Sequence, residues 1–326
     1  MNGVVAKNLA HTAPTRFVPP GTSALTIRRR DAPLEAVSSK SGEFRLLHTH
    51  ARSELTEMFL HQDARLALTP AGEIIETFYL LSGKLGGEFA GNAYVLEPGD
   101  AVLTENLPEP FFLTALTDVK ILYLTEKPQF HTISEHLSQL KHLAIEVELK
   151  DGYTAGHCER LQELSYRTGL KLGLSSTDLY HLYFGAYLHD VGKIRVPLTI
   201  LNKPGKLTSD EWDVIKKHAE YGRELLENTF MTRSGKIVEQ HHERLDGSGY
   251  PFGLRGDEIS IEAAVVAVAD TFDAMTTDRP YRKAMDATSA LDEIWRYAGV
   301  HYRRDVVSAF TSIIKAEFLP GAEQSF

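Results

Sequence analysis

The sequence predicts two structural parts, an antiparallel β domain followed by an all-α domain. Two patterns support this fold class. Between about residues 44 and 125, short apolar runs are broken by Pro, Gly and Asp at near-regular spacing, as in an antiparallel barrel or jelly roll. After Lys127-Pro128, apolar residues recur at spacings of three and four, which is typical of amphipathic helices, and strand-like alternation does not return.

Composition narrows the class of protein. The chain has 326 residues, of which 43% are hydrophobic and 24% charged, so it can bury two globular cores. Its net charge of -9 at pH 7 provides no basic field for duplex nucleic acid, and we expect no such partner. Cys158 is the only cysteine, which excludes an internal disulfide and fits a reducing compartment. The longest uncharged apolar run, around residues 263–269, is too short to span a bilayer, and the N-terminus lacks the apolar core of a signal peptide. We therefore expect a cytoplasmic protein without a membrane partner.

The chain divides into four predicted segments. Residues 1–24 are rich in Pro, Thr and Ala and have no periodicity, which predicts a disordered tail. Residues 25–127 form the β domain, residues 128–150 a linking helix, and residues 151–326 the helical domain. Within the last of these we expect helices at about 157–173, 176–191, 208–228, 232–243, 259–276, 286–298 and 303–318.

The predicted linking helix carries a long apolar stripe. The residues of this stripe are Ile133, Leu137, Leu140, Ala144 and Val147. A stripe of this length is too large to leave exposed on a linker, so it should pack on the helical domain or on a second subunit. Because two-fold pairing is the commonest arrangement of soluble oligomers, we expect a homodimer.

The adjacent pair His241-His242 suggests a metal site in the helical domain. Neighbouring residues on a helix point about 100° apart, so one buried face cannot hold both rings. An isolated histidine is more often a solvated or satisfied side chain than a ligand. However, Asp270 closes the apolar run AAVVAVA, and a carboxylate is costly to bury without a partner. The ligand-type residues of this domain are His157, His189, Asp190, His218, His241, His242 and Asp270. Imidazole suits first-row transition metals and a carboxylate can bridge two ions, so this set predicts a two-metal site.

The order of these motifs resembles the HD-GYP family of HD-domain metal phosphohydrolases, over roughly residues 145–312. The matching stretches are YTAGH, LHDVGKIRVP, ILNKPGKLT, HAEYG, HHERLDGSGYPFGL, VADTFDAMTTDRPYR and, more loosely, VVSAF. The resemblance implies an HD-type helical bundle that holds two divalent ions. It implies a first site of His157, His189, Asp190 and Asp270. It implies a second site of Asp190, as the bridge, with His218, His241 and His242. In the family these ions are iron or manganese, and the ligand types do not choose between them.

The resemblance also implies roles for residues around the metals. Lys193 would contact the scissile phosphate, although a solvated cation at a helix end is the simpler alternative. Tyr250 would shape the substrate pocket, and Arg279 and Arg282 would grip the phosphates of the substrate, a task that suits the guanidinium fork. Asp151 stands where some members have an acid that contacts the substrate.

Two positions depart from the family pattern. Some members have a Glu four residues before the first ligand histidine, and it supports a third metal. Tyr153 stands at that position here, and because a neutral phenol ligates poorly we expect two metals. Cys158 stands where the motif usually has Ser, which we interpret as an exchange of one small side chain for another.

The implied activity is a cyclic di-GMP phosphodiesterase that opens its substrate to pGpG through a hydroxide shared by two metals, with further cleavage to GMP left open. A catalytically silent cyclic-dinucleotide receptor or interaction module is the main alternative. It is disfavoured because every expected ligand is present, together with Lys193. An HD hydrolase with another substrate, such as cyclic GMP-AMP or a nucleotide monophosphate, is the third interpretation.

The β domain resembles a cupin barrel, with LLSGKL and LEPGDAVL at the positions of the two signature turns. Active cupins carry an HxH pair upstream of a Glu; when Glu76 is aligned with that Glu, residues 70–72 (PAG) occupy the histidine positions. A second pair, His48 and His50 in GEFRLLHTHARSE, precedes the LLSG turn by about thirty residues, too far for one motif. We therefore expect a domain without a metal, which binds a small-molecule ligand, mediates dimerisation, or does both.

Overall fold

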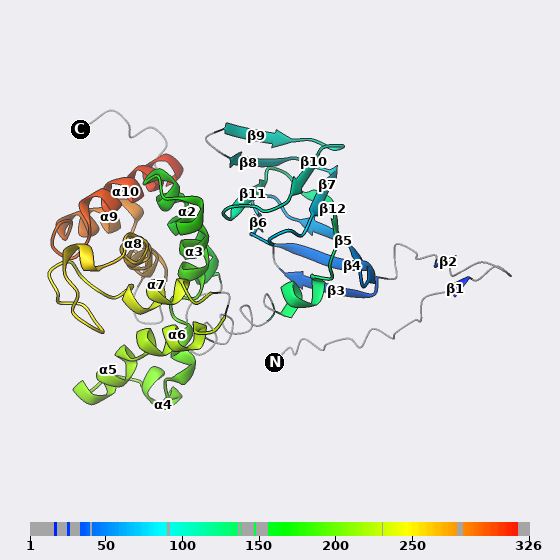
Figure 1. The fold of residues 1–326 in the computed structure, drawn as a ribbon. Coiled ribbons are helices and arrows are strands. Elements are labelled where there is room, and N and C mark those ends of the chain that lie inside the picture. Colours follow the sequence, from blue (N-terminus) through cyan, green and yellow to red (C-terminus); the bar gives the residue numbers. More distant parts are fainter. Residues whose placement is uncertain are drawn as a thin grey trace. The chain divides into compact units, whose positions relative to one another are not determined.

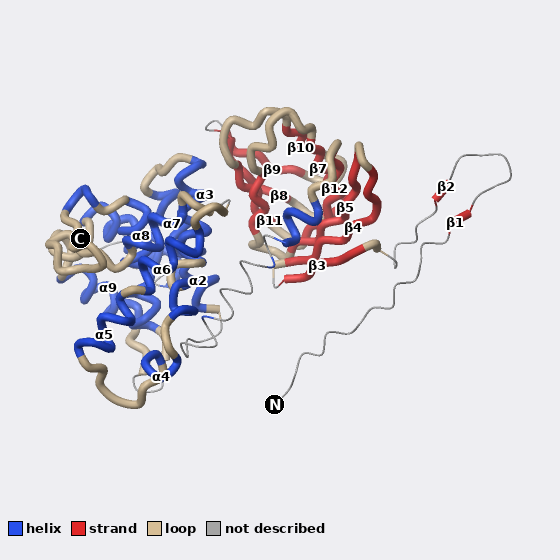
Figure 2. Tube along the Cα trace, turned by 60° about the horizontal axis from the view of Figure 1, so that its bottom comes forward, coloured by secondary structure: helices blue, strands red, loops and turns tan. Residues whose placement is uncertain are grey.

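The computed structural model of the chain describes residues 16–17, 25–26, 33–39, 41–89, 92–135, 138, 147, 156–229, 231–278 and 283–318. The chain divides into two compact units, Met1–Glu135 and His136–Phe326. Figure 2 shows strands in the first unit and helices in the second, apart from a short helical segment at residues 130–135 of the first. The predicted tail lies almost entirely outside the described residues, and so does most of the linking helix.

The first unit consists of antiparallel sheets (Figure 1). The larger sheet has the order β10-β7-β12-β5-β4-β3 and the smaller the order β6-β11-β8-β9. The strands of the larger sheet are β3 (Glu35–Ser39), β4 (Gly42–His50), β5 (Ser53–Leu60), β7 (Glu76–Ser82), β10 (Ala101–Thr104) and β12 (Val119–Thr125). Those of the smaller sheet are β6 (Arg65–Leu68), β8 (Leu85–Phe89), β9 (Asn92–Leu96) and β11 (Phe111–Ala115). A separate short ladder pairs β1 (Arg16–Phe17) with β2 (Leu25–Thr26).

The predicted antiparallel β architecture is confirmed, but the described strands form two sheets and not one closed barrel. The chain crosses between the two sheets after β5, β6, β7, β9, β10 and β11, and among the described strands no ladder joins one sheet to the other. The two sheets share one core, in which Met58 and Ile121 of the larger sheet are buried with Leu68 and Leu113 of the smaller.

One part of this interior is polar. Glu76 is buried and accepts hydrogen bonds from Tyr123 Oη at 2.5 Å and from Thr104 Oγ1 at 3.1 Å. Glu54 is fully buried, and its Oε1 accepts the backbone N–H groups of Gln129 at 3.1 Å and Phe130 at 2.7 Å. The carboxylate of Glu54 therefore fixes the start of the helical segment that leaves the β unit.

The second unit is helical, as predicted. Its elements are α2 (His157–Lys171), α3 (Ser176–Tyr187), η1 (Val191–Arg195), α4 (Leu198–Leu201), α5 (Ser209–Lys216), α6 (His218–Leu226), α7 (Ser234–Gln240), η2 (Gly256–Glu258), α8 (Ile261–Thr276), α9 (Ala287–Arg296) and α10 (Arg304–Phe318). Side-chain caps fix several helix starts: Ser175, Thr208, Ser260 and Asp286 each accept a backbone N–H of the helix that follows. None of the described helices combines the length and the apolarity that crossing a bilayer requires.

Two predicted helices are interrupted. The predicted helix at 176–191 ends at Tyr187, and the chain then passes through a turn into η1. Gly192 of η1 lies against α6, where a Cβ on this residue would come within 1.9 Å of the carbonyl oxygen of His218. Because Gly192 has no side chain, η1 can lie this close to α6. The predicted helix at 208–228 is also two helices, α5 and α6, separated at Lys217.

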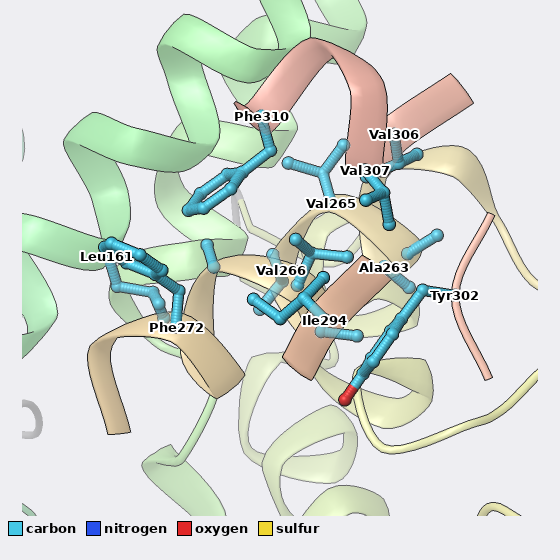
Figure 3. Close-up of a cluster of buried hydrophobic side chains, with 14 of the residues drawn as sticks. Leu161, Ala263, Val265, Val266, Phe272, Ile294, Tyr302, Val306, Val307 and Phe310 are labelled. Carbon is cyan, nitrogen blue, oxygen red and sulfur yellow. The ribbon is translucent and has the colours of Figure 1, made fainter. Parts of the chain in front are cut away.

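Helix α8 runs through the core of the second unit. Its residues 263–269 are all buried, which explains why the run AAVVAVA has no polar face. Figure 3 shows Val265 and Val266 of α8 among side chains of α9 and α10, and the rings of Phe272 and Phe310 lie 5.2 Å apart. The buried path of α8 holds the carboxylates near its C-terminal end in fixed positions.

Candidate metal centre

Three predicted ligands form what we call the first group: His157, His189 and Asp270. His157 is the first residue of α2, His189 lies in the turn after α3, and Asp270 is in α8. His157 Nε2 lies 3.5 Å from His189 Nε2 and 3.8 Å from Asp270 Oδ1. The facing nitrogens and the carboxylate oxygen surround one small volume.

Four predicted ligands form the second group: Asp190, His218, His241 and His242. Asp190 precedes η1, His218 begins α6, and the histidine pair follows the last residue of α7. Asp190 Oδ1 lies 3.3 Å from His218 Nε2 and 3.9 Å from His241 Nε2. Its other oxygen, Oδ2, lies 3.2 Å from His189 Nε2 of the first group. Asp190 thus turns one oxygen toward each group, which is the arrangement of a bridging carboxylate.

The end of α7 accounts for the adjacent histidines. Because α7 ends at Gln240, His241 and His242 are not constrained to one helical face, and their ring centroids lie 3.9 Å apart. His218 lies within 5.5 Å of both rings. Both imidazoles of the pair therefore lie beside His218 in the second group.

Backbone acceptors orient three of the imidazoles. The Nδ1 atoms lie close to the carbonyl oxygen of the third preceding residue: His189 to Ala186 at 2.9 Å, His218 to Ile215 at 2.7 Å, and His241 to Val238 at 2.6 Å. A carbonyl can only accept, so each Nδ1 carries the proton and donates it. The Nε2 lone pair is left free to bind a metal.

The residues of both groups fit a metal. Within the described part of the chain, four buried ligand atoms lack a hydrogen-bond partner: Asp190 Oδ1, His218 Nε2, His241 Nε2 and Asp270 Oδ1. Leaving several buried polar atoms unsatisfied in one place is costly, and metal coordination removes that cost. Imidazole with carboxylate is also a donor set that suits divalent transition metals.

The electrostatics of the centre favour the metal-binding form of Asp190 and of three histidines, but not of His189. Burial alone would raise the pKa of Asp190, but Lys193 and His189 hold it well below its usual range. Burial lowers the pKa of His218, His241 and His242, so these rings are neutral at neutral pH. At His189, burial is outweighed by Asp190, which raises the pKa to about 9; a metal therefore has to displace a proton there.

Two other predicted site residues lie beside the second group. Lys193 is 7% exposed, and its Nζ donates to Asp190 Oδ2 at 2.8 Å, so it is not a solvated cation at a helix end. The ring centroids of Tyr250 and His242 lie 4.7 Å apart, and the two ring planes are inclined at 31°. Burial raises the pKa of Tyr250, so its phenol stays neutral. Asp151, Tyr153, Arg279 and Arg282 lie outside the described residues.

Four residues that the sequence did not single out also belong to this region. Trp212 of α5 has its ring 6.3 Å from Tyr250. Glu243 accepts the backbone N–H groups of Phe252 and Leu254 at 2.7 and 3.0 Å, and so holds the turn that contains Tyr250.

Asp273 contacts His157 and Arg160. Burial alone would raise the pKa of Asp273, but hydrogen bonds from these two partners lower it to about 2. The D-x-x-D spacing in VADTFDA was the available signal for Asp273, since residues i and i+3 share a helix face.

The sequence of the second unit matches a known protein family. The HD domain family matches residues 138–306, just over half of the chain, and the chain belongs to this family. The predicted resemblance to HD-GYP phosphohydrolases is confirmed by this match and by the relatives below.

Curated relatives are phosphodiesterases of cyclic dinucleotides. The cyclic di-GMP phosphodiesterase response regulator RpfG of Xanthomonas campestris is 44% identical over 163 residues, 49% of this chain and 43% of the relative. A cyclic di-GMP phosphodiesterase of Thermotoga maritima is 38% identical over 207 residues, 60% of this chain and 55% of the relative. The 3'3'-cGAMP-specific phosphodiesterase 3 of Vibrio cholerae is 43% identical over 147 residues, 44% of this chain and 32% of the relative. The chain spans about half or less of the length of these relatives.

Solved structures resemble each unit in part. A cyclic GMP-AMP specific phosphodiesterase of V. cholerae covers 55% of this chain and 48% of its own, with 17% identity and a TM-score of 0.44. An RmlC-like cupin from Shewanella frigidimarina covers 29% of this chain and 85% of its own, with 12% identity and a TM-score of 0.26. The cupin assignment of the first unit stays a prediction from its sequence motifs.

Proposed function

We propose that the chain is a metal-dependent phosphodiesterase that hydrolyses cyclic di-GMP to pGpG, with onward cleavage to GMP left open. One observation supports this above the others: two groups of buried ligand atoms are joined by the two oxygens of Asp190. This arrangement suits an in-line displacement at phosphorus, for which two-metal sites are common catalysts.

The proposed centre holds two divalent ions, iron or manganese, one at each group. His157, His189 and Asp270 hold the first ion, His218, His241 and His242 hold the second, and Asp190 binds both. When bound, the ions supply an activated water and neutralise charge on the phosphate. Two ions and not three are proposed, since Tyr153 stands where a third would need a carboxylate.

Residues around the centre would bind and orient the substrate. Lys193 places a buried ammonium next to Asp190, where it can also donate to a phosphate oxygen. Tyr250 offers a neutral hydroxyl and a ring beside His242, and Trp212 extends this aromatic surface. Aromatic rings accept stacked nucleobases, which suits a substrate with two bases. Arg279, Arg282 and Asp151 complete the proposed contacts with phosphate and base.

The choice of substrate follows the relatives. Proteins named cyclic di-GMP phosphodiesterase are 44% and 38% identical to the chain, and one named for 3'3'-cGAMP is 43% identical. Cyclic GMP-AMP is therefore the second candidate. A silent receptor is disfavoured, because the structure brings all seven predicted ligands together with Lys193.

The β unit completes the proposal. We assign it a regulatory role, through a small-molecule ligand or through formation of a homodimer, and no chemistry of its own. This assignment rests on the sequence, in which residues 70–72 (PAG) occupy the positions where active cupins have their HxH pair. A cytoplasmic location belongs to the same proposal, because the single cysteine, Cys158, fits a reducing compartment.

Incubation with a panel of cyclic dinucleotides tests the proposal. The chain loaded with Mn(II) or Fe(II) should convert cyclic di-GMP to pGpG faster than it cleaves 3'3'-cGAMP or cyclic di-AMP, as chromatography of the products would show. Asp190→Asn keeps the shape of the side chain but removes the bridge, and should lower the rate by at least about 100-fold. Tight binding of cyclic di-GMP without any product, under metal-loaded conditions, would instead support the receptor.

A further inference from the structure

The first group is held in place by a buried carboxylate that is not one of its ligands. Asp273 follows Asp270 by one turn of α8, is 5% exposed, and its Oδ2 lies 2.7 Å from His157 Nδ1. Arg160, one turn after His157 on α2, donates from Nε to Oδ1 at 2.7 Å and from Nη2 to Oδ2 at 2.9 Å. Two parallel hydrogen bonds of this kind fix the plane of the carboxylate. The orientation of Asp273 is therefore set by α2, the same helix that carries His157.

The position of His157 explains why such support matters. It is the first residue of α2, and the N-cap, Gly156, has φ of 87° and supplies no side-chain hydrogen bond to the helix. Helix ends without caps tend to fray. The bond to Asp273 ties this end of α2 to the buried helix α8, 116 residues away in the sequence.

His157 differs in this respect from three other imidazoles of the two groups. His189 of the first group, and His218 and His241 of the second, are oriented by carbonyl oxygens of residues three positions earlier. A carboxylate is a stronger acceptor than a carbonyl and makes the histidine that donates to it a more basic metal ligand. The first group therefore contains one imidazole, His157, whose direction and donor strength are set by a carboxylate.

We infer that Asp273 is a positioning residue of the first group, which holds His157 with Nδ1 protonated and Nε2 aimed at the ion, while Arg160 fixes the carboxylate. The inference rests on the proposed two-metal function. It implies that the affinity for the ion at the first group depends on the Asp273–Arg160 pair, which lies outside the ligand set. The affinity for the ion at the second group does not depend on that pair.

Titration of metal-free protein with Co(II) tests this role, because the d–d absorption and equilibrium dialysis report each ion without any need for turnover. Asp273→Asn has nearly the same shape, but its amide is a weaker acceptor and can donate to Nδ1, which favours the wrong tautomer. The dissociation constant of one Co(II) should rise by about 10- to 100-fold, and that of the other should change less than about three-fold. The control is Asp178→Asn, which breaks another carboxylate–guanidinium pair, with Arg233, and should bind both ions as the wild type does.

The outcomes separate the inference from the proposed function. A wild-type chain that binds fewer than two Co(II) ions overturns the two-metal centre itself. Two ions bound with wild-type affinity by Asp273→Asn, or an equal loss at both sites, overturn only the role of Asp273. If circular dichroism shows that Asp273→Asn does not fold, Arg160→Gln takes its place, since it keeps the carboxylate but releases its plane. It should weaken the same ion by a smaller factor, and an unchanged affinity would overturn the inference.

Discussion

A histidine binds a metal only when one ring nitrogen is unprotonated and faces the ion, and the protein arranges this at four positions by occupying Nδ1. Backbone carbonyls do so at His189, His218 and His241, and Asp273 does so at His157. The acceptors fix both the tautomer and the direction of each ring before a metal binds. This is the preorganisation that the two-metal proposal needs.

The predicted phosphate-binding arginines should be separable from the metal ligands. Arg279→Ala and Arg282→Ala should each retain two metals while weakening the binding of cyclic di-GMP by about 1.5–3 kcal/mol, roughly 10- to 150-fold, because a charge-assisted bond is lost. Equilibrium binding and elemental analysis measure the two effects separately. Arg296→Ala, which removes an exposed arginine on α9, is the control and should leave both unchanged. Loss of metal with normal substrate binding would contradict the roles assigned to the pair.

Site residues were easiest to predict where the neighbouring sequence shows that a charged side chain must be buried. Asp270 could be identified because a carboxylate at the end of an apolar run needs a partner, and the structure places it beside two histidines. The D-x-x-D spacing places Asp273 on the same helix face as Asp270, but its partner His157 is 116 residues away in the sequence, so the contact itself was missed. Trp212 was missed for the same reason, since an exposed tryptophan on a polar helix has no distinctive pattern.

At the scale of elements, the close approach of η1 to α6 holds Asp190 and His218 together. A Cβ on Gly192 would lie 1.9 Å from the carbonyl oxygen of His218 and 2.5 Å from the backbone nitrogen of Gly222. Only a glycine allows the two backbones to come this near. The sequence predicted one helix at 176–191, because helical periodicity does not show where a neighbouring backbone will force the chain to turn. It likewise suggested a barrel where the strands form two sheets, since strand pairing is set by contacts distant in the sequence.

Gly192→Ala should therefore damage both stability and the second group. We expect it to lower the free energy of unfolding by about 1–3 kcal/mol or more, as overpacking does, and to weaken the affinity for one metal because His218 is pushed away. Urea denaturation and metal titration measure these effects. Gly235→Ala on α7 is the matched control, since its Cβ would meet its nearest atoms at 3.5 Å or beyond. It should change the free energy of unfolding by no more than about 1 kcal/mol. Equal behaviour of the two variants would contradict the role given to the η1–α6 contact.

At the scale of the whole molecule, the two units have separate cores, and the proposed metal ligands all belong to the second. A chain that begins at residue 128 should therefore keep two metals and measurable hydrolysis of cyclic di-GMP, while losing any response to a ligand of the β unit. Sedimentation should report a dimer for the full chain. A monomeric full chain whose kinetics match those of the shortened one would leave the β unit without its proposed role.

The central claim is that hydrolysis depends on two ions at the groups joined by Asp190. Stepwise addition of Mn(II) to metal-free full-length protein, with formation of pGpG from cyclic di-GMP measured at each step, tests it most directly. We predict negligible product without metal and a rate that reaches its plateau when two equivalents are bound. No product at saturating metal, or a full rate with one equivalent or none, would contradict the account.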